Sequence, residues 1–156
     1  MPKGFKLITC IVVCELAGII GSIFTINSIP TWYATLQKPI FSPPNYLFGP
    51  VWTTLYFLMG ISFYLIVSKK LKGKNKKAIY IFAVQLFLNA IWSPIFFSLK
   101  SPLWGLIVII TLWFAIILTI KEFWKIEKRA AYLLLPYLAW VSFATVLNLS
   151  IYILNK

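Results

Sequence analysis

Residues 32–52 read WYATLQKPIFSPPNYLFGPVW, and this stretch decides how the rest of the chain is interpreted. It combines aromatic side chains with a Lys38-Pro39 pair and a Pro43-Pro44 pair, and it is the only long stretch that is unsuited to a bilayer. Loops longer than about 12–15 residues are usually functional or disordered, and this one is too apolar to be disordered. We therefore predict that residues 27–46 form a structured loop, which folds back onto the helix ends as a lid.

The sequence on both sides of this loop is that of a membrane protein. Of its 156 residues, 61% are hydrophobic and only 12% are charged, whereas soluble domains have about 25% charged residues. Mean hydropathy is +0.89. Each apolar run is close to the ~20 residues that a helix needs to cross ~30 Å of hydrocarbon. We predict an all-α integral membrane protein, a bundle of five transmembrane helices in a single domain 1–156, with spans at about 5–26, 47–68, 78–99, 102–123 and 130–153.

The net charge of +12 is distributed unevenly between the two ends of the predicted bundle. One end carries most of the basic residues: Lys3, Lys6, Lys69, Lys70, Lys72, Lys74, Lys76, Lys77, Lys121, Lys125, Lys128 and Arg129. The other end has Lys38, Lys100 and Lys156. Cytoplasmic loops carry the excess of Lys and Arg, so we predict a cytoplasmic N-terminus and an external C-terminus. A prokaryotic cell membrane is a separate expectation, which the charge pattern does not establish. We interpret the charge as topology and contact with lipid headgroups, and not as nucleic-acid binding.

Three predicted helices each place aromatic and polar or small residues on one face. In a membrane bundle such residues identify the interior face. They are Trp52, Tyr56, Met59 and Phe63 in the second helix, Gln85, Asn89, Trp92 and Phe96 in the third, and Trp140, Ala144, Leu147, Asn148 and Ile151 in the fifth. We predict a pocket with aromatic walls, in which Asn89 and Asn148 meet polar edges of a ligand. The alternative is that these amides only hydrogen-bond neighbouring helices.

Other features of the spans leave their roles open. Pro94 and Pro136 are expected to bend their helices, because proline removes a backbone donor. Ala17, Gly18, Gly21 and Ser22 allow close approach of another helix, in this chain or in a second subunit. Glu15 lies well inside a span, either as a proton or ligand contact or as an acid bonded to a neighbouring helix.

The chain lacks the residues of several common reactions. It has no histidine and only three acids, Glu15, Glu122 and Glu127, so it offers no pair of catalytic carboxylates and no predicted metal site. Catalysis would have to come from aromatic residues, a bound chromophore or radical chemistry.

The order of short motifs along the chain resembles that of the TspO/MBR family of translocator and tryptophan-rich sensory proteins. The resemblance covers nearly the whole chain and rests on Trp32-Tyr33, Lys38-Pro39, Pro43-Pro44, Gly49-Pro50-Val51-Trp52-Thr53, Gln85-Leu86, Leu88-Asn89, Trp92-Ser93-Pro94, Pro136-Tyr137, Ala139-Trp140 and Leu147-Asn148.

The resemblance implies a five-helix bundle, often a homodimer, with no obligatory cofactor and a pocket closed by the first loop. It implies porphyrins (protoporphyrin IX or haem), benzodiazepine-type drugs and sterols as ligands. Because the chain lacks histidine, metal-free porphyrin is favoured over ligated haem. The ligand-binding residues expected on this basis are Trp32, Tyr33, Pro43, Pro44, Trp52, Tyr56, Asn89, Trp92, Trp140, Ala144, Leu147 and Asn148.

The chain departs from the family's proposed cholesterol motif. That motif places Tyr directly after the Leu-Asn pair of the fifth helix, where this chain has Leu149. A pattern of the same general form follows as Leu149, Tyr152 and Lys156. Such patterns are weak evidence for sterol contact.

Three functions remain open from the sequence. The first is binding of planar lipophiles, with a sensory, regulatory or transport-linked role in tetrapyrrole handling. The second, which the resemblance implies, is light-driven oxidative degradation of protoporphyrin IX, with Trp52 and Trp140 as the catalytic residues carried over by position. The third is transport of porphyrin or sterol, which the absence of visible inverted repeats with broken helices disfavours.

Overall fold

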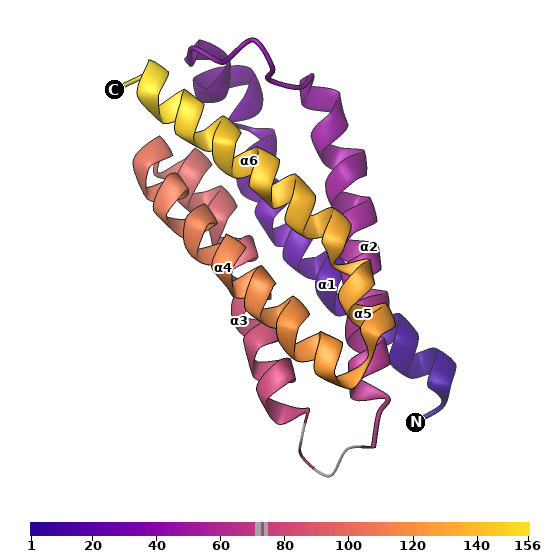
Figure 1. The fold of residues 1–156 in the computed structure, drawn as a ribbon. Helices are drawn as coiled ribbons and strands as arrows, with labels where there is room; N and C mark the ends of the chain where they lie inside the picture. The colour runs from indigo at the N-terminus through magenta and orange to yellow at the C-terminus, as the bar shows by residue number, and fades with distance from the viewer. Residues whose placement is uncertain (71–72, 74) are drawn as a thin grey trace.

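The computed structural model describes residues 1–70, 73 and 75–156, and within them the predicted five-helix membrane bundle is confirmed. Five segments are long and apolar enough to cross a membrane. The helices are α1 (Lys3–Ile26), α2 (Phe48–Val67), α3 (Lys76–Ser93), α4 (Pro102–Ile126), α5 (Lys128–Leu133) and α6 (Leu135–Leu154), and α5 and α6 together form the last span. Figure 1 shows the N-terminus and the C-terminus at opposite ends of the bundle.

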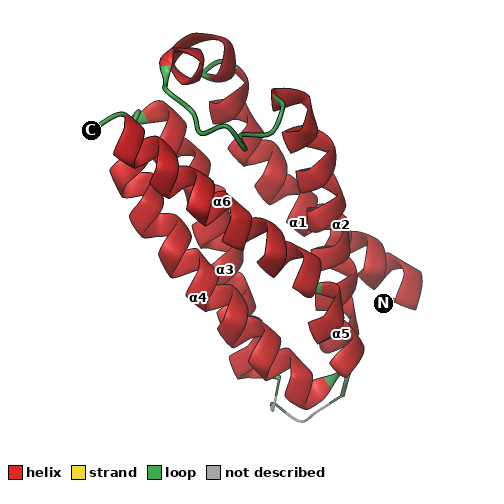
Figure 2. Ribbon diagram, turned by 45° about the horizontal axis from the view of Figure 1, so that its top comes forward, coloured by secondary structure: helices red, strands yellow, loops and turns green. Residues whose placement is uncertain are grey.

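Both prolines expected to bend a helix interrupt one. At Pro94, α3 gives way to the π-helical turn η3 (Pro94–Ser98), and Pro136 lies in the first turn of α6, just after the break between α5 and α6. A proline ring removes one backbone donor and clashes with the preceding turn, so the regular α-helical hydrogen bonding is interrupted at both positions. Figure 2 shows α5 and α6 following one another along the same edge of the bundle.

The connection between α1 and α2 is structured, as predicted. It contains the π-helical turn η1 (Ile29–Tyr33) and the short 3₁₀ turn η2 (Asn45–Leu47), joined by an irregular stretch with a turn at residues 40–41. We call the end of the bundle that carries this connection the lid end (Figure 1).

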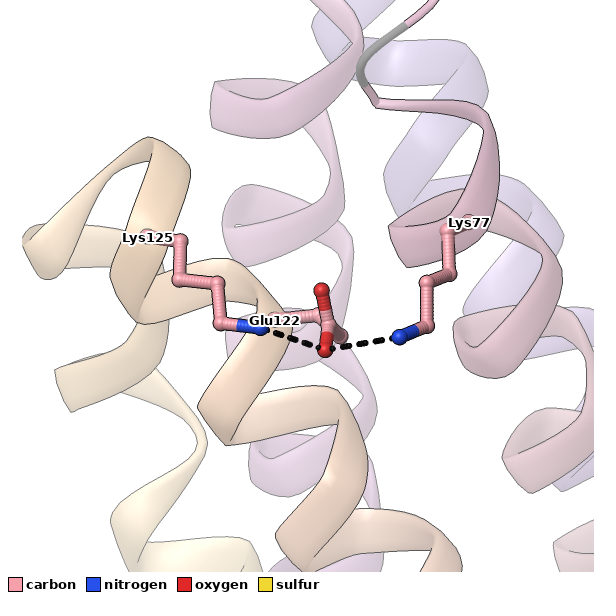
Figure 3. A network of polar contacts seen from close by, with 3 residues as sticks. All are labelled: Lys77, Glu122 and Lys125. Carbon is pink, nitrogen blue, oxygen red and sulfur yellow. Dashed lines mark hydrogen bonds and ion pairs between the residues drawn. The ribbon is translucent and has the colours of Figure 1, made fainter.

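The opposite end, here called the basic end, carries the N-terminus, the end of α2, the start of α3 and the α4–α5 connection (Figure 1). The Glu122 carboxylate accepts from Lys77 of α3 at 3.3 Å and from Lys125 at 2.8 Å, which ties α3 to α4 (Figure 3). The Lys69 ammonium lies 2.7 Å from Glu127 and, with the backbone N–H of Arg129, holds the pKa of that carboxyl below its usual range. Of the basic residues assigned to this end, Lys72 and Lys74 lie outside the described residues.

The half of the bundle nearer the basic end is solidly packed. Phe82 stacks between Phe63 and Phe123, with ring centroids 4.5 and 5.7 Å apart. Ser62 donates to the carbonyl of Ala130 at 2.7 Å, which joins α2 to α5. These contacts join α2, α3, α4 and α5 near the basic end.

The small residues of α1 pack within this chain. A Cβ atom added at Gly18 would lie 2.5 Å from the Tyr56 ring of α2, and one at Gly21 would lie 3.2 Å from the Ser93 hydroxyl of α3. On α2, a Cβ at Gly60 would lie 2.5 Å from the Cα of Ile11. Small residues let membrane helices approach closely, so Gly18 and Gly21 allow α1 to pack tightly against α2 and α3 of the same chain.

Candidate functional site

A cavity of about 310 Å³ lies in the lid half, lined by residues from η1, η3 and all five spans. Ligand sites usually occupy a few hundred to about 1,000 Å³ and are mostly apolar with a few polar groups. The lining includes nine residues expected to bind ligand: Tyr33, Trp52, Tyr56, Asn89, Trp92, Trp140, Ala144, Leu147 and Asn148. The three polar and aromatic helix faces identified in the sequence therefore converge on one space.

Aromatic rings form much of the cavity wall. Trp52 lies 5.6 Å from Tyr56 on the α2 side, and Trp92 stacks on Phe96 at 5.0 Å on the α3 side. Trp140 faces them from α6. Because these rings are packed against neighbours, their orientations are restricted before any ligand binds.

The loop between α1 and α2 is fastened over the lid end. Tyr33 is buried, and its ring lies 5.7 Å from that of Phe97. The backbone N–H of Gln37 donates to Asn155 Oδ1 at 2.9 Å, and Asn155 Nδ2 donates back to the Gln37 carbonyl at 2.8 Å. The Lys38 ammonium sits 4.6 Å above the Tyr33 ring, a cation–π contact. The loop is thus joined to η3 and to the end of α6.

A chain of hydrogen bonds crosses the bundle at the end of the cavity farthest from the lid, here called the deep end. The Tyr56 hydroxyl donates to Asn89 Oδ1, and Asn89 Nδ2 donates to the Tyr137 hydroxyl at 2.6 Å. The Tyr137 hydroxyl in turn donates to Gln85 Oε1 at 2.9 Å. These four buried residues link α2, α3 and α6. Asn89 and Gln85 therefore hydrogen-bond neighbouring helices, which was the alternative to ligand contact.

Asn148 has a similar role nearer the lid. Its Oδ1 accepts from Trp92 Nε1 at 3.3 Å, and its Nδ2 donates to the Pro102 carbonyl at 2.8 Å. Both amides that we expected to meet the polar edges of a ligand thus have protein partners. Each amide oxygen keeps one further lone pair, which is the acceptor capacity that remains for a ligand.

Trp140 and Glu15 are two of the lining residues whose polar groups have no hydrogen-bond partner among the described residues. Trp140 Nε1 is buried and has no hydrogen-bond partner in the part of the chain that the structure describes. Glu15 also lines the cavity, from α1. Buried donors are nearly always bonded, so the Trp140 indole N–H is a candidate contact for a ligand acceptor.

Several predicted residues lie away from the cavity lining. Trp32 packs its ring 5.6 Å from Phe96, and the Pro43-Pro44 pair belongs to the extended part of the lid loop. These three residues belong to the lid loop and are not among the residues that line the cavity. The sterol-motif residues lie on the last turns of α6 and beyond: Leu149, Tyr152 and Lys156. None of the three lines the cavity.

Some residues of the site were not singled out as binding residues from the sequence. Phe48 lines the cavity with its ring 6.1 Å from Trp140, and Tyr137 completes the hydrogen-bond chain beneath it. Phe48 directly precedes the Gly49-Pro50 pair. Because proline is common in the first turn of a helix, this pair could have placed Phe48 at the start of α2, next to the predicted lid. The partners of Tyr137 depend on helix rotation, which the sequence pattern of a membrane helix reveals poorly.

The model of the TspO/MBR family matches residues 10–154, almost the whole chain. The chain belongs to the TspO/MBR family. The sequence resemblance is therefore confirmed, and the lid, the bundle and the cavity described above are those of a TspO/MBR chain.

Curated TspO/MBR relatives match over most of their length. The chain is 47% identical to the tryptophan-rich protein TspO of Archaeoglobus fulgidus over 96% of this chain and 97% of the relative. It is 41% identical to the human translocator protein, over 86% and 80% of the two chains. It is 36% identical to the tryptophan-rich sensory protein of Cereibacter sphaeroides, over 80% and 77%.

Proposed function

We propose that the cavity binds porphyrins and related planar lipophiles, including benzodiazepine-type drugs and sterols, with no obligatory cofactor. The observation that carries this proposal is the convergence of Trp52, Trp92 and Trp140 on one lidded space. A flat apolar macrocycle matches a slot with aromatic walls, and each well-placed aromatic pair adds about 0.5–1.5 kcal/mol beyond the burial of area. Family membership supports the same ligand class, and metal-free porphyrin suits a chain without histidine.

The test is a titration of purified protein with protoporphyrin IX, followed by the shift of the porphyrin absorption band. Replacing Trp52 and Trp140 together by Phe removes ring area at two walls, and we expect the dissociation constant to rise about fivefold or more. Trp104→Phe is the matched control, because Trp104 is exposed and outside the lining. An unchanged dissociation constant in the double variant would contradict the proposal.

A second candidate is light-driven oxidative degradation of the bound porphyrin. It is favoured by the unpartnered indole N–H of Trp140 in the cavity, with Trp52 in the same lining. In this reaction the photoexcited porphyrin takes an electron from a tryptophan indole and passes it to dioxygen, which becomes superoxide. The indole radical cation recovers its electron from the porphyrin, and the porphyrin radical cation combines with superoxide, so that dioxygen is consumed and the macrocycle is oxidised. Illumination under oxygen tests it: bleaching of porphyrin no faster than that of the free dye would exclude turnover.

A transport-linked or sensory role would build on the same binding step. We propose it in the context of tetrapyrrole handling, since relatives are named translocator and sensory proteins. Uptake of porphyrin into vesicles with and without the protein tests transport, and equal fluxes would restrict the role to binding or sensing.

We also propose an orientation in a prokaryotic cell membrane, with the basic end cytoplasmic and the lid external. It rests on the excess of Lys and Arg at the basic end. A cysteine introduced at exposed Tyr46 of η2 should react with a membrane-impermeant maleimide from outside intact cells, whereas one at Lys76 should not. The reverse labelling pattern would overturn the orientation. Anionic lipids at the basic end and a second copy of the chain are the proposed partners.

A further inference from the structure

The three acidic residues of the chain have different surroundings. Glu122 and Glu127 pair with lysines at the basic end. Glu15 lies within α1, inside a candidate membrane span, and lines the cavity. Among the described residues it forms no ion pair and no side-chain hydrogen bond in the structure. An acid in hydrocarbon is costly to keep without a partner, so the position of Glu15 calls for an explanation.

Glu15 lies at the deep end of the cavity. When each span is followed from the lid end toward the basic end, the last lining residues are Glu15, Tyr56, Asn89, Leu112 and Trp140. The polar groups of Tyr56 and Asn89 bond to each other and to Tyr137. The Glu15 carboxyl, in contrast, has no partner within the described chain, although it lines the same cavity.

A carboxyl group in this position discriminates between ligand groups by charge. Away from water, a carboxylate is stabilised by an ammonium or an N–H donor, because electrostatic interactions are stronger at low dielectric constant. A ligand carboxylate at the same place would be repelled, or one of the two acids would have to be protonated. A carboxyl group at the deep end thus favours ammonium and N–H groups of a ligand there. It also favours the orientation of an acidic ligand in which the ligand carboxylates point away from the deep end.

We propose that Glu15 makes the deep end of the cavity a binding position for the ammonium or N–H group of a planar lipophile, and that it excludes ligand carboxylates from that position. This inference rests on the proposed function and adds a specificity-determining residue to it. The acidic edge of an amphiphile such as protoporphyrin then faces the lid, where Lys38 sits over Tyr33 of the lining.

The experiment compares two probes that share the same macrocycle and linkers, one with ammonium groups and one in which acetylation has removed their charge. The amine probe is a protoporphyrin IX derivative with both propionates converted to aminoethyl amides, and the neutral probe is its N-acetylated form. Dissociation constants of both are measured in detergent at neutral pH for the wild type and for Glu15→Gln, which keeps the size of the side chain. Glu127→Gln is the control, because Glu127 loses the same charge outside the cavity.

We expect the wild type to bind the amine probe at least tenfold more tightly than the neutral probe. In Glu15→Gln that ratio should fall at least tenfold, and in Glu127→Gln it should stay at the wild-type value. Equal affinity of the wild type for the two probes would overturn the inference even if Glu15→Gln does not fold. Failure of every probe, protoporphyrin IX included, to bind the wild type would instead contradict the proposed function, and the inference with it.

Discussion

The amide nitrogen of Asn89 donates a hydrogen bond of 2.6 Å to the hydroxyl of Tyr137, which joins α3 to α6 at the deep end of the cavity. Both residues are buried, and Tyr137 also donates to Gln85. The same groups that close the cavity therefore hold the bundle together. Changes here are expected to act on stability before they act on ligand contacts.

Tyr137→Phe should destabilise the bundle by about 1–2 kcal/mol, because it leaves the Asn89 donor and the Gln85 acceptor buried without partners. The measurement is reversible unfolding in mixed micelles, followed by circular dichroism. Tyr132→Phe is the control, since Tyr132 is exposed and its hydroxyl has no hydrogen bond to the described part of the chain. Equal stability of Tyr137→Phe and the wild type would show that the hydrogen-bond chain contributes little.

Gly60→Ala should also destabilise the protein, by about 1–3 kcal/mol as for other overpacked positions. The new Cβ would lie 2.5 Å from the Cα of Ile11, and backbone cannot rotate away as a side chain can. The change therefore forces α1 and α2 apart. Gly4→Ala is the control, because a Cβ there meets nothing within 4 Å. If both variants unfold at the wild-type temperature, the close approach of Gly60 in α2 to Ile11 in α1 does not contribute to stability.

Asn155→Ala should loosen the lid. It removes two hydrogen bonds to the backbone of Gln37, at 2.9 and 2.8 Å, each worth about 0.5–1.5 kcal/mol. We expect porphyrin to dissociate several-fold faster, measured by stopped-flow transfer to an excess of lipid vesicles. Asn75→Ala at the opposite end of the bundle should leave that rate unchanged. A wild-type dissociation rate in Asn155→Ala would mean that the ligand does not leave through the part of the lid that the Asn155–Gln37 hydrogen bonds hold in place.

Lys38→Gln should weaken binding of protoporphyrin IX relative to its dimethyl ester. The Lys38 ammonium lies beside the lining residue Tyr33, where it attracts propionates. Partly exposed charge pairs contribute up to about 1 kcal/mol, so we expect a two- to fivefold loss for the diacid that shrinks in high salt. Lys156→Gln tests whether any positive charge at the lid end has the same effect. Parallel losses for diacid and ester would assign Lys38 a structural role.

Much of the architecture was predictable because bilayer thickness and proline chemistry act locally. Apolar runs of about 20 residues predicted the positions of the membrane-spanning helices, and Pro94 and Pro136 predicted where two of them are interrupted. Both predictions depend only on a short stretch of sequence. The structured character of residues 27–46 followed from their aromatic and proline content. Convergence of Trp52, Trp92 and Trp140 on one space followed from polar and small neighbours on the same helix faces.

Pairing between helices was decided by the tertiary structure. The sequence left open whether Asn89 and Asn148 meet a ligand or a neighbouring helix, and whether Gly18 and Gly21 meet this chain or another. Those outcomes depend on how each helix is rotated and how far apart the helices lie. When every face of a helix is apolar, the local sequence contains little information about either.

By itself, then, the sequence determined the membrane bundle, its lid and the aromatic character of its interior, since hydrophobic length and backbone chemistry act residue by residue. Only the tertiary structure decided which polar groups bond to one another and which are left for a ligand. The reason is that a hydrogen bond needs two side chains from different helices at about 3 Å, a condition that no single segment contains.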